Sequence, residues 1–301
     1  MEKIEHIEIK KGMSVKDLIS SYSKLGFGAR RIARATEILN KMIKDKECTK
    51  FFGLAGAMVP AGMKLVVKKI LDNKWADVFV TTGANITHDI VEALGNRHYI
   101  GTQNVKDADL RDKMINRIYD VYMKNEVYED LEDFCTKIFP EIDGKEMTVK
   151  EFLWFIGSKL KDSNSILRTC YEKKIPIFCP GISDSGLGLQ VWNYIQQGSL
   201  KVLDFYDLKE LIDTAWTSKK AGCLLVGGGV PKNHIIQAMQ FSPKHLSYAV
   251  QITTDRPEPG GLSGAELREG ISWGKLNKDA EYADVICDAT IALPLIVAGL
   301  E

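Results

Sequence analysis

The chain has 301 residues, with 40 lysines and arginines balanced by 40 aspartates and glutamates. This length suits one large α/β domain with a sizeable buried core. Because the charges cancel, nothing in the composition indicates a nucleic acid or an anionic membrane surface as the partner.

The first 48 residues predict a helical N-terminal segment that is not a separate domain. Ser14 and Asp17 can cap a first helix, and a second amphipathic helix is expected from about Ala29 to Lys44. The N-terminus itself is charged, and no apolar run reaches ~18 residues. We therefore expect neither a secretion signal nor a membrane span.

From residue 50 onward, short apolar runs ending in small residues alternate with helical stretches, at least six times. Helices are expected at about Gly62 to Leu71 and His88 to Leu94, and residues 97 to 173 look more polar and helical. The alternation predicts a doubly wound, mainly parallel Rossmann-like sheet with helices on both faces. With no flexible linker in view, residues 1–301 are interpreted as a single domain.

Six scattered cysteines form no C-x-x-C pair. They are typical of small buried residues in a reducing compartment, so we expect a cytoplasmic protein without a disulfide framework or a metal site.

The unusual loops all follow predicted strands, and such loops meet at the edge of a parallel sheet where ligands bind. The glycines of GLAGAMVPAG and GGGVPKNH would let backbone N–H groups approach a pyrophosphate, although a triple glycine alone is more often a tight turn. Asp184 and Asp288 can accept hydrogen bonds from ribose hydroxyls or, equally well, cap the helices that follow.

Lys275 is the candidate for covalent chemistry. It follows Trp273 and Gly274 in SGAELREGISWGKL, which would pack its ammonium against a ring and backbone. Desolvation favours the neutral amine, the form that makes or attacks an imine. Glu269, four residues before Trp273, can bind a cationic amine if the run is helical. The alternative is an exposed lysine closing a surface helix.

The blocks SGA, EGISWGKL and YADVICDATIALPLIVA resemble deoxyhypusine synthases, from about residue 10 to the C-terminus. The TGANITHD and GGGVPKN forms are similar to a shorter, prokaryotic-type branch of that family. The resemblance implies an imine-forming role for Lys275 and a substrate pocket that includes Glu269, Trp273, Gly274, His88, Asn233 and Ser263. It also implies NAD as cofactor, contacted at Gly56, Ala57, Met58, Val59, Pro60, Thr82, Gly83, Ala84, Asp184, Gly228, Thr254, Asp255, Asp288 and Ala289.

The implied activity is transfer of the aminobutyl group of spermidine, through an enzyme-lysine imine, to a lysine of the translation initiation factor 5A precursor. A homotetramer is also implied. The sequence departs from the better-known eukaryotic form at a glutamate pair, here Thr87 and His88, and at an active-site histidine, here Asn233. Two polyamine-binding aspartates fall on Leu189 and Leu262.

These departures keep other hypotheses open. One is an enzyme resembling homospermidine synthase, or one using agmatine as donor. Another is a catalytically silent paralogue that acts as a regulatory subunit, although a silent subunit would have no need of Lys275, Trp273 and Glu269 together. His88 is a candidate acid or base, or else a capping or core residue.

Overall fold

The computed structural model describes residues 1–300, which form two compact units. The first unit comprises residues 1–56, 69–80 and the chain from Leu208 onward; the second comprises residues 57–68 and 81–207. Each unit is described by itself below. That the chain is a single domain, as the sequence analysis predicts, stays a prediction.

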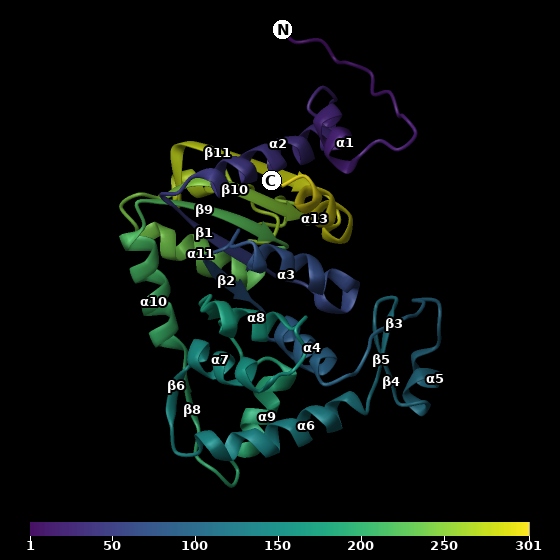
Figure 1. The fold of residues 1–301 in the computed structure, drawn as a ribbon, viewed down its shortest axis with the longest axis vertical. Helices are drawn as coiled ribbons and strands as arrows, with labels where there is room; N and C mark the ends of the chain where they lie inside the picture. Colours follow the sequence, from purple (N-terminus) through teal and green to yellow (C-terminus); the bar gives the residue numbers. More distant parts are fainter. Residues whose placement is uncertain (301) are drawn as a thin grey trace. The chain divides into compact units, whose positions relative to one another are not determined.

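The central sheet has six strands in the order β11-β10-β9-β1-β2-β7. Figure 1 labels the first five of these. Numbered along the chain, these are the sixth, fifth, fourth, first, second and third strands, which is the order of the Rossmann fold. The predicted doubly wound, mainly parallel fold is confirmed. The strands are β1 (Cys48–Leu54), β2 (Val78–Thr81), β7 (Ile177–Phe178), β9 (Lys220–Val226), β10 (Leu246–Thr253) and β11 (Leu276–Ile286).

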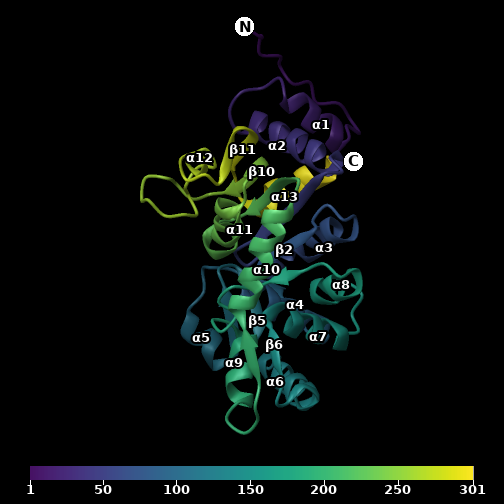
Figure 2. The same cartoon turned by 90° about the vertical axis from the view of Figure 1, so that its left-hand side faces the viewer.

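In the first unit, helices cover both faces of the sheet, as two strand glycines show (Figures 1 and 2). A Cβ on Gly222 of β9 would lie 2.7 Å from the sulfur of Met42 in α2 (Phe27–Lys44). A Cβ on Gly53 of β1 would lie 3.0 Å from Ile235 in α11 (Gly229–Phe241). Gly53 pairs with Leu225, three residues beyond Gly222, so the two glycines face opposite sides of the sheet.

The N-terminal helices match their sequence signals. Ser14 caps α1 (Val15–Tyr22), its hydroxyl accepting from the N–H of Asp17 at 3.1 Å and donating to the Asp17 carboxylate at 2.6 Å. Helix α2 begins at Phe27, two residues before the predicted start. The remaining helices of this unit and its margins are α3 (Lys64–Asp72), α10 (Asp204–Thr217), α12 (Glu269–Ser272) and α13 (Ala289–Ala298).

The second unit is mostly helical and carries two small sheets, with orders β3-β5-β4 and β6-β8. Its elements are η1 (Val59–Met63), α4 (Gly83–Ala93), β3 (Tyr99–Ile100), α5 (Asp107–Asp112), β4 (Ile115–Ile118), β5 (Val121–Lys124), α6 (Val127–Ile138), η2 (Phe139–Ile142), β6 (Glu146–Thr148), α7 (Val149–Lys159), α8 (Ile166–Lys173), α9 (Gly186–Tyr194) and β8 (Lys201–Leu203).

Three sequence expectations are corrected here. Helix α4 begins at Gly83, five residues before His88, because the Thr82 hydroxyl accepts from the N–H of Asn85 and caps it. Helix α3 begins at Lys64, because Gly62 in the preceding π-helical turn has a left-handed φ of 85°. The segment expected to be helical from residue 97 includes the antiparallel strands β3, β4 and β5.

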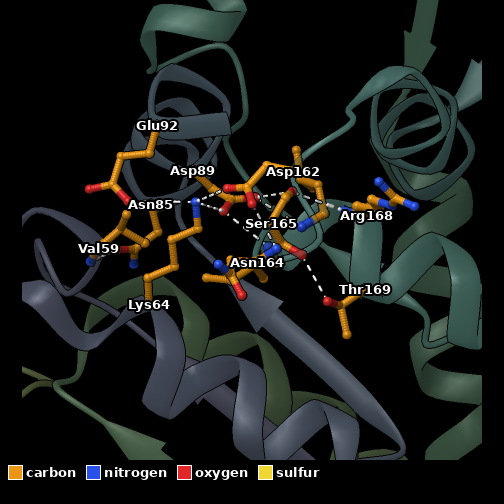
Figure 3. A network of polar contacts seen from close by, with 12 residues as sticks. Val59, Lys64, Asn85, Asp89, Glu92, Asp162, Asn164, Ser165, Arg168 and Thr169 are labelled. Atoms are coloured by element: carbon orange, nitrogen blue, oxygen red, sulfur yellow. Dashed lines mark hydrogen bonds and ion pairs between the residues drawn. The ribbon is translucent and has the colours of Figure 1, made fainter. Parts of the chain in front are cut away.

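A buried ionic network organises the second unit (Figure 3). The Lys64 ammonium lies 3.5 Å from Asp89, 3.5 Å from Glu92 and 3.1 Å from Asp162. The Asp89 carboxylate also accepts from the N–H groups of Ile166 at 3.0 Å and Leu167 at 2.9 Å. These N–H groups have no partner within α8, so Asp89 caps that helix from a distant part of the chain.

Three further expectations concern disulfides, membrane spans and metal sites. All six cysteines are free, and only Cys287 is not fully buried. Among residues 1–300, no helix is both long and apolar enough to cross a membrane. Over the same residues, no group of three or more histidine, cysteine, aspartate or glutamate side chains could hold a metal ion.

Candidate active site

Lys275 lines a cavity of about 130 Å³ in the first unit, which we call the lysine cavity. It lies in the turn between α12 and β11, with its ammonium 5.3 Å from the centre of the Trp273 ring. Trp273 and Glu269 line the same cavity. The structure therefore brings together the three residues that the sequence singled out. The other lining residues are Lys232, Ile236, Leu262, Ala265, Glu266, Leu267, Gly270 and Leu276.

The turn that presents Lys275 depends on Gly274. Helix α12 is a single turn from Glu269 to Ser272, and Trp273 ends it. Gly274 follows with a left-handed φ of 65°, and the Lys275 N–H then donates to the carbonyl of Gly270 at 2.8 Å. Glycine is favoured there because a Cβ penalises that backbone conformation. Glu269 and Trp273 remain exposed beside the cavity, with Trp273 58% exposed.

A second lysine, which the sequence interpretation missed, lies at the same cavity. Lys232 of α11 is 3% exposed and donates to the carbonyls of Leu262 at 2.8 Å and Ala265 at 2.7 Å. Burial lowers its pKa to about 8, against the opposing effect of the Asp284 carboxylate. Lys232 thus anchors the segment that borders Lys275 on one side of the cavity.

Three predicted substrate residues of the first unit are not among those that line the lysine cavity: Gly274, Asn233 and Ser263. Asn233 donates to Gln237 one turn along α11, at 2.8 Å. The Ser263 hydroxyl accepts from the N–H of Gly229 at 2.9 Å, and its carbonyl accepts from Gln251 at 3.1 Å. In the first unit, Ser263 therefore holds the triple-glycine turn in place.

The first unit also offers a cradle at the point where the strand order reverses, between β1 and β9. A Cβ on Gly227 would lie 3.1 Å from that of Ala55, and one on Gly228 only 2.3 Å from the Cα of Ser263. Gly227 has a left-handed φ of 74°. Gly227 and Gly228 thus let this turn pack closely on Ala55 and Ser263, just before the N-terminus of α11, which is a kind of place where a pyrophosphate can bind.

Other predicted cofactor residues of the first unit lie after its strands. Thr254 and Asp255 follow β10 and are exposed. Asp288 follows β11 and accepts from the N–H of Thr290 at 2.7 Å, so it caps α13, which begins at Ala289. The capping alternative for Asp288 is therefore confirmed, and a role toward ribose remains a prediction. Gly56 has a φ of 75° and is the last residue of the first segment of this unit.

The predicted cofactor residues of the second unit gather around Asn85. Its side chain accepts from the Val59 N–H at 3.3 Å and donates to the Thr82 hydroxyl at 3.3 Å. A Cβ on Gly83 would lie 2.4 Å from that of Ser185, which places the Thr82–Gly83–Ala84 turn beside the loop carrying the exposed Asp184. Ala57, Met58 and Pro60 flank Val59. The sequence interpretation missed Asn85, which joins two of the predicted segments.

His88 also belongs to the second unit, where it is 8% exposed. Its Nδ1 lies 2.9 Å from Nε2 of His98. Burial, together with His98, lowers the pKa of His88 to about 4, so the ring is neutral at pH 7. His98 and Glu92 were not predicted, because their contact with His88 comes from the fold.

Comparison with known proteins gives one consistent family. A model of the family described as deoxyhypusine synthase matches residues 17–300. A Methanosarcina acetivorans protein named probable deoxyhypusine synthase 1 is 44% identical over 298 residues, covering 99% of this chain and 94% of that protein. An Archaeoglobus fulgidus protein of the same name is 45% identical over 293 residues, covering 97% and 96%.

A comparison of structures finds a similar fold in a protein with the same family name. A crystal structure of an Entamoeba histolytica protein named as a deoxyhypusine synthase superposes with a TM-score of 0.69. The identity is 23%, and the match covers 99% of this chain and 96% of that one.

Proposed function

The chain belongs to the deoxyhypusine synthase family and is an enzyme of that type, and we propose that it moves the aminobutyl group of spermidine, through an imine on Lys275, to a lysine of the translation initiation factor 5A precursor. The observation that carries the proposal is the lysine cavity, which Lys275 lines together with Glu269 and Trp273. A nucleophilic amine, a carboxylate for a cationic substrate and an aromatic wall are the parts that amine transfer requires.

NAD, when bound, supplies a hydride acceptor for the donor amine and returns the hydride at the end. The residues of the first unit proposed to hold it are Gly227, Gly228 and Asp288. The NAD contacts predicted in the second unit, among them Thr82 and Asp184, stay predictions. The place of Gly227 and Gly228 supports this proposal, because they precede the N-terminus of α11 at the point where the strand order reverses.

The chain's own residues carry the transfer. Glu269 binds an ammonium of the donor, and Trp273 provides an aromatic wall on one side of the cavity. The Lys275 amine attacks the oxidised carbon, the bond to the departing 1,3-diaminopropane breaks, and the four-carbon group remains as an imine on Lys275. The acceptor lysine then attacks that imine carbon and releases Lys275 unchanged.

Trapping with borohydride tests the proposal. Purified protein is incubated with NAD and spermidine and reduced, and its intact mass and modified peptide are measured. An aminobutyl group on Lys275 that requires NAD and disappears in Lys275→Ala supports the proposal. Lys278→Ala is the matched control, because Lys278 lies exposed three residues further on, in β11. No adduct with any amine, although NAD binds, would favour the silent regulatory subunit.

One observation favours a second candidate. Leu262 lines the lysine cavity, at a position where the better-known eukaryotic members carry a polyamine-binding aspartate. A donor other than spermidine, such as agmatine, or putrescine as acceptor, would suit a cavity with fewer carboxylates. An adduct formed with agmatine but not with spermidine would replace the first candidate by this one.

We further propose a cytoplasmic homotetramer. Large apolar side chains are exposed in the first unit at Trp216, Phe241 and Ile291, and exposed apolar surface of this kind supports self-association. Light scattering of the purified protein tests the proposal, and a monomer at micromolar concentration would contradict it.

A further inference from the structure

A second cavity of the first unit, of about 560 Å³, is lined by four arginines, and we call it the arginine cavity. Helix α2 contributes Arg30, Arg31 and Arg34, and it lies beside β11, the edge strand of the sheet (Figures 1 and 2). Arg268 directly precedes α12. The other lining residues are Phe27, Glu266, Tyr282, Ala283 and Asp284. Apart from Glu266, the arginine cavity shares no lining residue with the lysine cavity, and no residue predicted to contact NAD lines it.

The lining of the arginine cavity carries more positive than negative charge. Two carboxylates, Glu266 and Asp284, accompany the four arginines, which leaves a formal surplus of two positive charges. Arg268 already engages Glu266 at 2.5 Å. The Asp284 carboxylate accepts from the N–H of Leu267 at 3.2 Å, and its burial raises its pKa against the effect of the Arg31 charge. An anion that enters the cavity therefore meets a net attractive field.

Arg30 and Arg31 are oriented by the protein and keep most of their donors unused. Nε of Arg30 donates to the carbonyl of Leu25 at 2.5 Å. One Nη of Arg31 donates to the backbone carbonyl of Asp284 at 3.0 Å. A guanidinium has five N–H donors, so each side chain is held by one of them and can offer the others to a ligand. Within residues 1–300 neither arginine forms an ion pair, whereas Arg34 has carboxylate partners on α2 and β11.

The start of α2, at the edge of this cavity, is unfavourable in the protein alone. Gly26 precedes the helix without a side-chain cap, and the first turn has no acidic residue. Instead, three arginines lie within the first eight residues, although cations are disfavoured near the positive end of a helix dipole. Phe27 is 98% exposed and has a left-handed φ of 56°, an outlier for a bulky side chain. Such outliers cluster at ligand clamps and active sites, and a bound anion would offset the charge of the arginines.

We propose that the arginine cavity binds a small molecule that carries a diphosphate group, with the phosphates held by Arg30 and Arg31. Guanidinium groups match phosphate oxygens with pairs of parallel N–H donors, and the volume of the cavity falls in the ~300–1,000 Å³ range of small-molecule sites. Inorganic pyrophosphate and a nucleoside diphosphate share this chemistry. The rings of Phe27 and Tyr282 offer a stacking surface for the base of the nucleotide. The alternative is a helix face whose arginines are only solvated.

Calorimetry with inorganic pyrophosphate tests the proposal, in protein saturated with NAD so that the proposed cofactor site is filled. At constant ionic strength, one pyrophosphate should bind per chain. Arg30→Gln and Arg31→Gln should each weaken this binding about tenfold or more, because each removes charged hydrogen bonds, while the affinity for NAD stays unchanged. A titration with ADP identifies the ligand. Tighter binding of ADP that is lost in Phe27→Ala indicates a nucleotide, and equal or weaker binding indicates that the diphosphate alone is recognised.

A control variant and a second measurement support this test. Arg111→Gln changes an exposed arginine of α5, in the second unit, and should bind pyrophosphate as the wild type does. In denaturant unfolding, pyrophosphate should raise the free energy of unfolding of the wild type but not that of the double variant Arg30→Gln/Arg31→Gln. Without pyrophosphate the double variant should be at least as stable as the wild type, because two cations are removed from the positive end of α2.

Three results would overturn the proposal. The first is no pyrophosphate binding by the wild type, and the second is equal binding by the wild type and the double variant. The third is a different mass of the double variant in light scattering, because the two arginines would then contact a second copy of the chain instead of a ligand. None of these measurements uses the chemistry of Lys275, so the arginine cavity is tested separately from the proposed aminobutyl transfer.

Discussion

Replacing Lys232 by methionine is expected to remove a pH-dependent component of stability from the first unit. Lys232 is buried, and its pKa of about 8 lies below the ordinary lysine value of 10.5. Since one pKa unit corresponds to ~1.36 kcal/mol, the charged form is disfavoured in the folded protein by about 3 kcal/mol. Methionine has a similar length and carries no charge at any pH.

The sign follows from proton binding. Between pH 8 and 10.5 the unfolded chain keeps the Lys232 proton that the folded chain has lost, so the free energy of unfolding rises with pH. Below pH 8 both states are protonated, and the full penalty applies. The wild-type free energy of unfolding, relative to Lys232→Met, should therefore increase by about 3 kcal/mol between pH 7 and 10.5.

Denaturant unfolding at pH 7, 8, 9 and 10 measures this difference, because titrating groups common to both proteins cancel. Lys278→Met, in an exposed part of β11, should run parallel to wild type. At pH 7 the variant also loses the hydrogen bonds to Leu262 and Ala265, worth about 1.5–3 kcal/mol each for a charged donor. We expect slower trapping at Lys275 as that segment loosens. Parallel curves for wild type and Lys232→Met would refute the reasoning.

Three further predictions concern other parts of the chain. Asp89→Asn should lower the free energy of unfolding, measured with denaturant, by about 3 kcal/mol, because it removes the charge that faces buried Lys64 and caps α8. Asp133→Asn, on the exposed surface of α6, is the control and should change this free energy little. Gly228→Ala should weaken NAD binding, measured by calorimetry, about tenfold or more, because the new Cβ would collide with the Cα of Ser263. Gly261→Ala is the control: its Cβ would meet nothing within 4 Å, so this variant should bind NAD as the wild type does. His88→Gln should remove about 3 kcal/mol of the loss in unfolding free energy that acid causes in the wild type. The pKa of His88 in the folded protein, about 4, lies below the ordinary 6.5, so this contribution to stability is complete above pH 6.5 and is lost between pH 6.5 and 4. Denaturant unfolding across this range measures the loss, and equal losses in both proteins would contradict the assignment.

The sheet was predictable from the sequence because strand, loop and helix alternate with clear local signals. Apolar runs such as Cys223 to Val226 end in glycine, and the periodicity changes where a helix follows. Boundaries were less predictable. The start of α4 moved to Gly83, since Thr82 caps a helix whose first turn of Gly, Ala and Asn has weak helical preference.

The lysine cavity was predictable in part, for a local reason. Glu269, Trp273 and Lys275 lie within seven residues of one another, so one turn of helix suffices to bring them together. Lys232 comes from α11 and could not be inferred, because nothing local distinguishes a buried lysine from the many exposed ones. The same holds for His98, whose contact with His88 depends on the path of the chain from α4 into β3.

The carboxylates of the lysine cavity bear on which amine it accepts. Glu266 and Glu269 both line it, but Glu266 already pairs with Arg268 at 2.5 Å. Leu262 adds apolar surface, and Lys232 adds an ammonium that repels a second positive charge placed near it. We therefore propose Glu269 as the main anchor for one cationic end of the donor, with the far end recognised by groups outside this cavity. Donor preference should accordingly depend on the length between the two charges of the amine more than on affinity at Lys275, which is why spermidine and agmatine are the informative pair to compare.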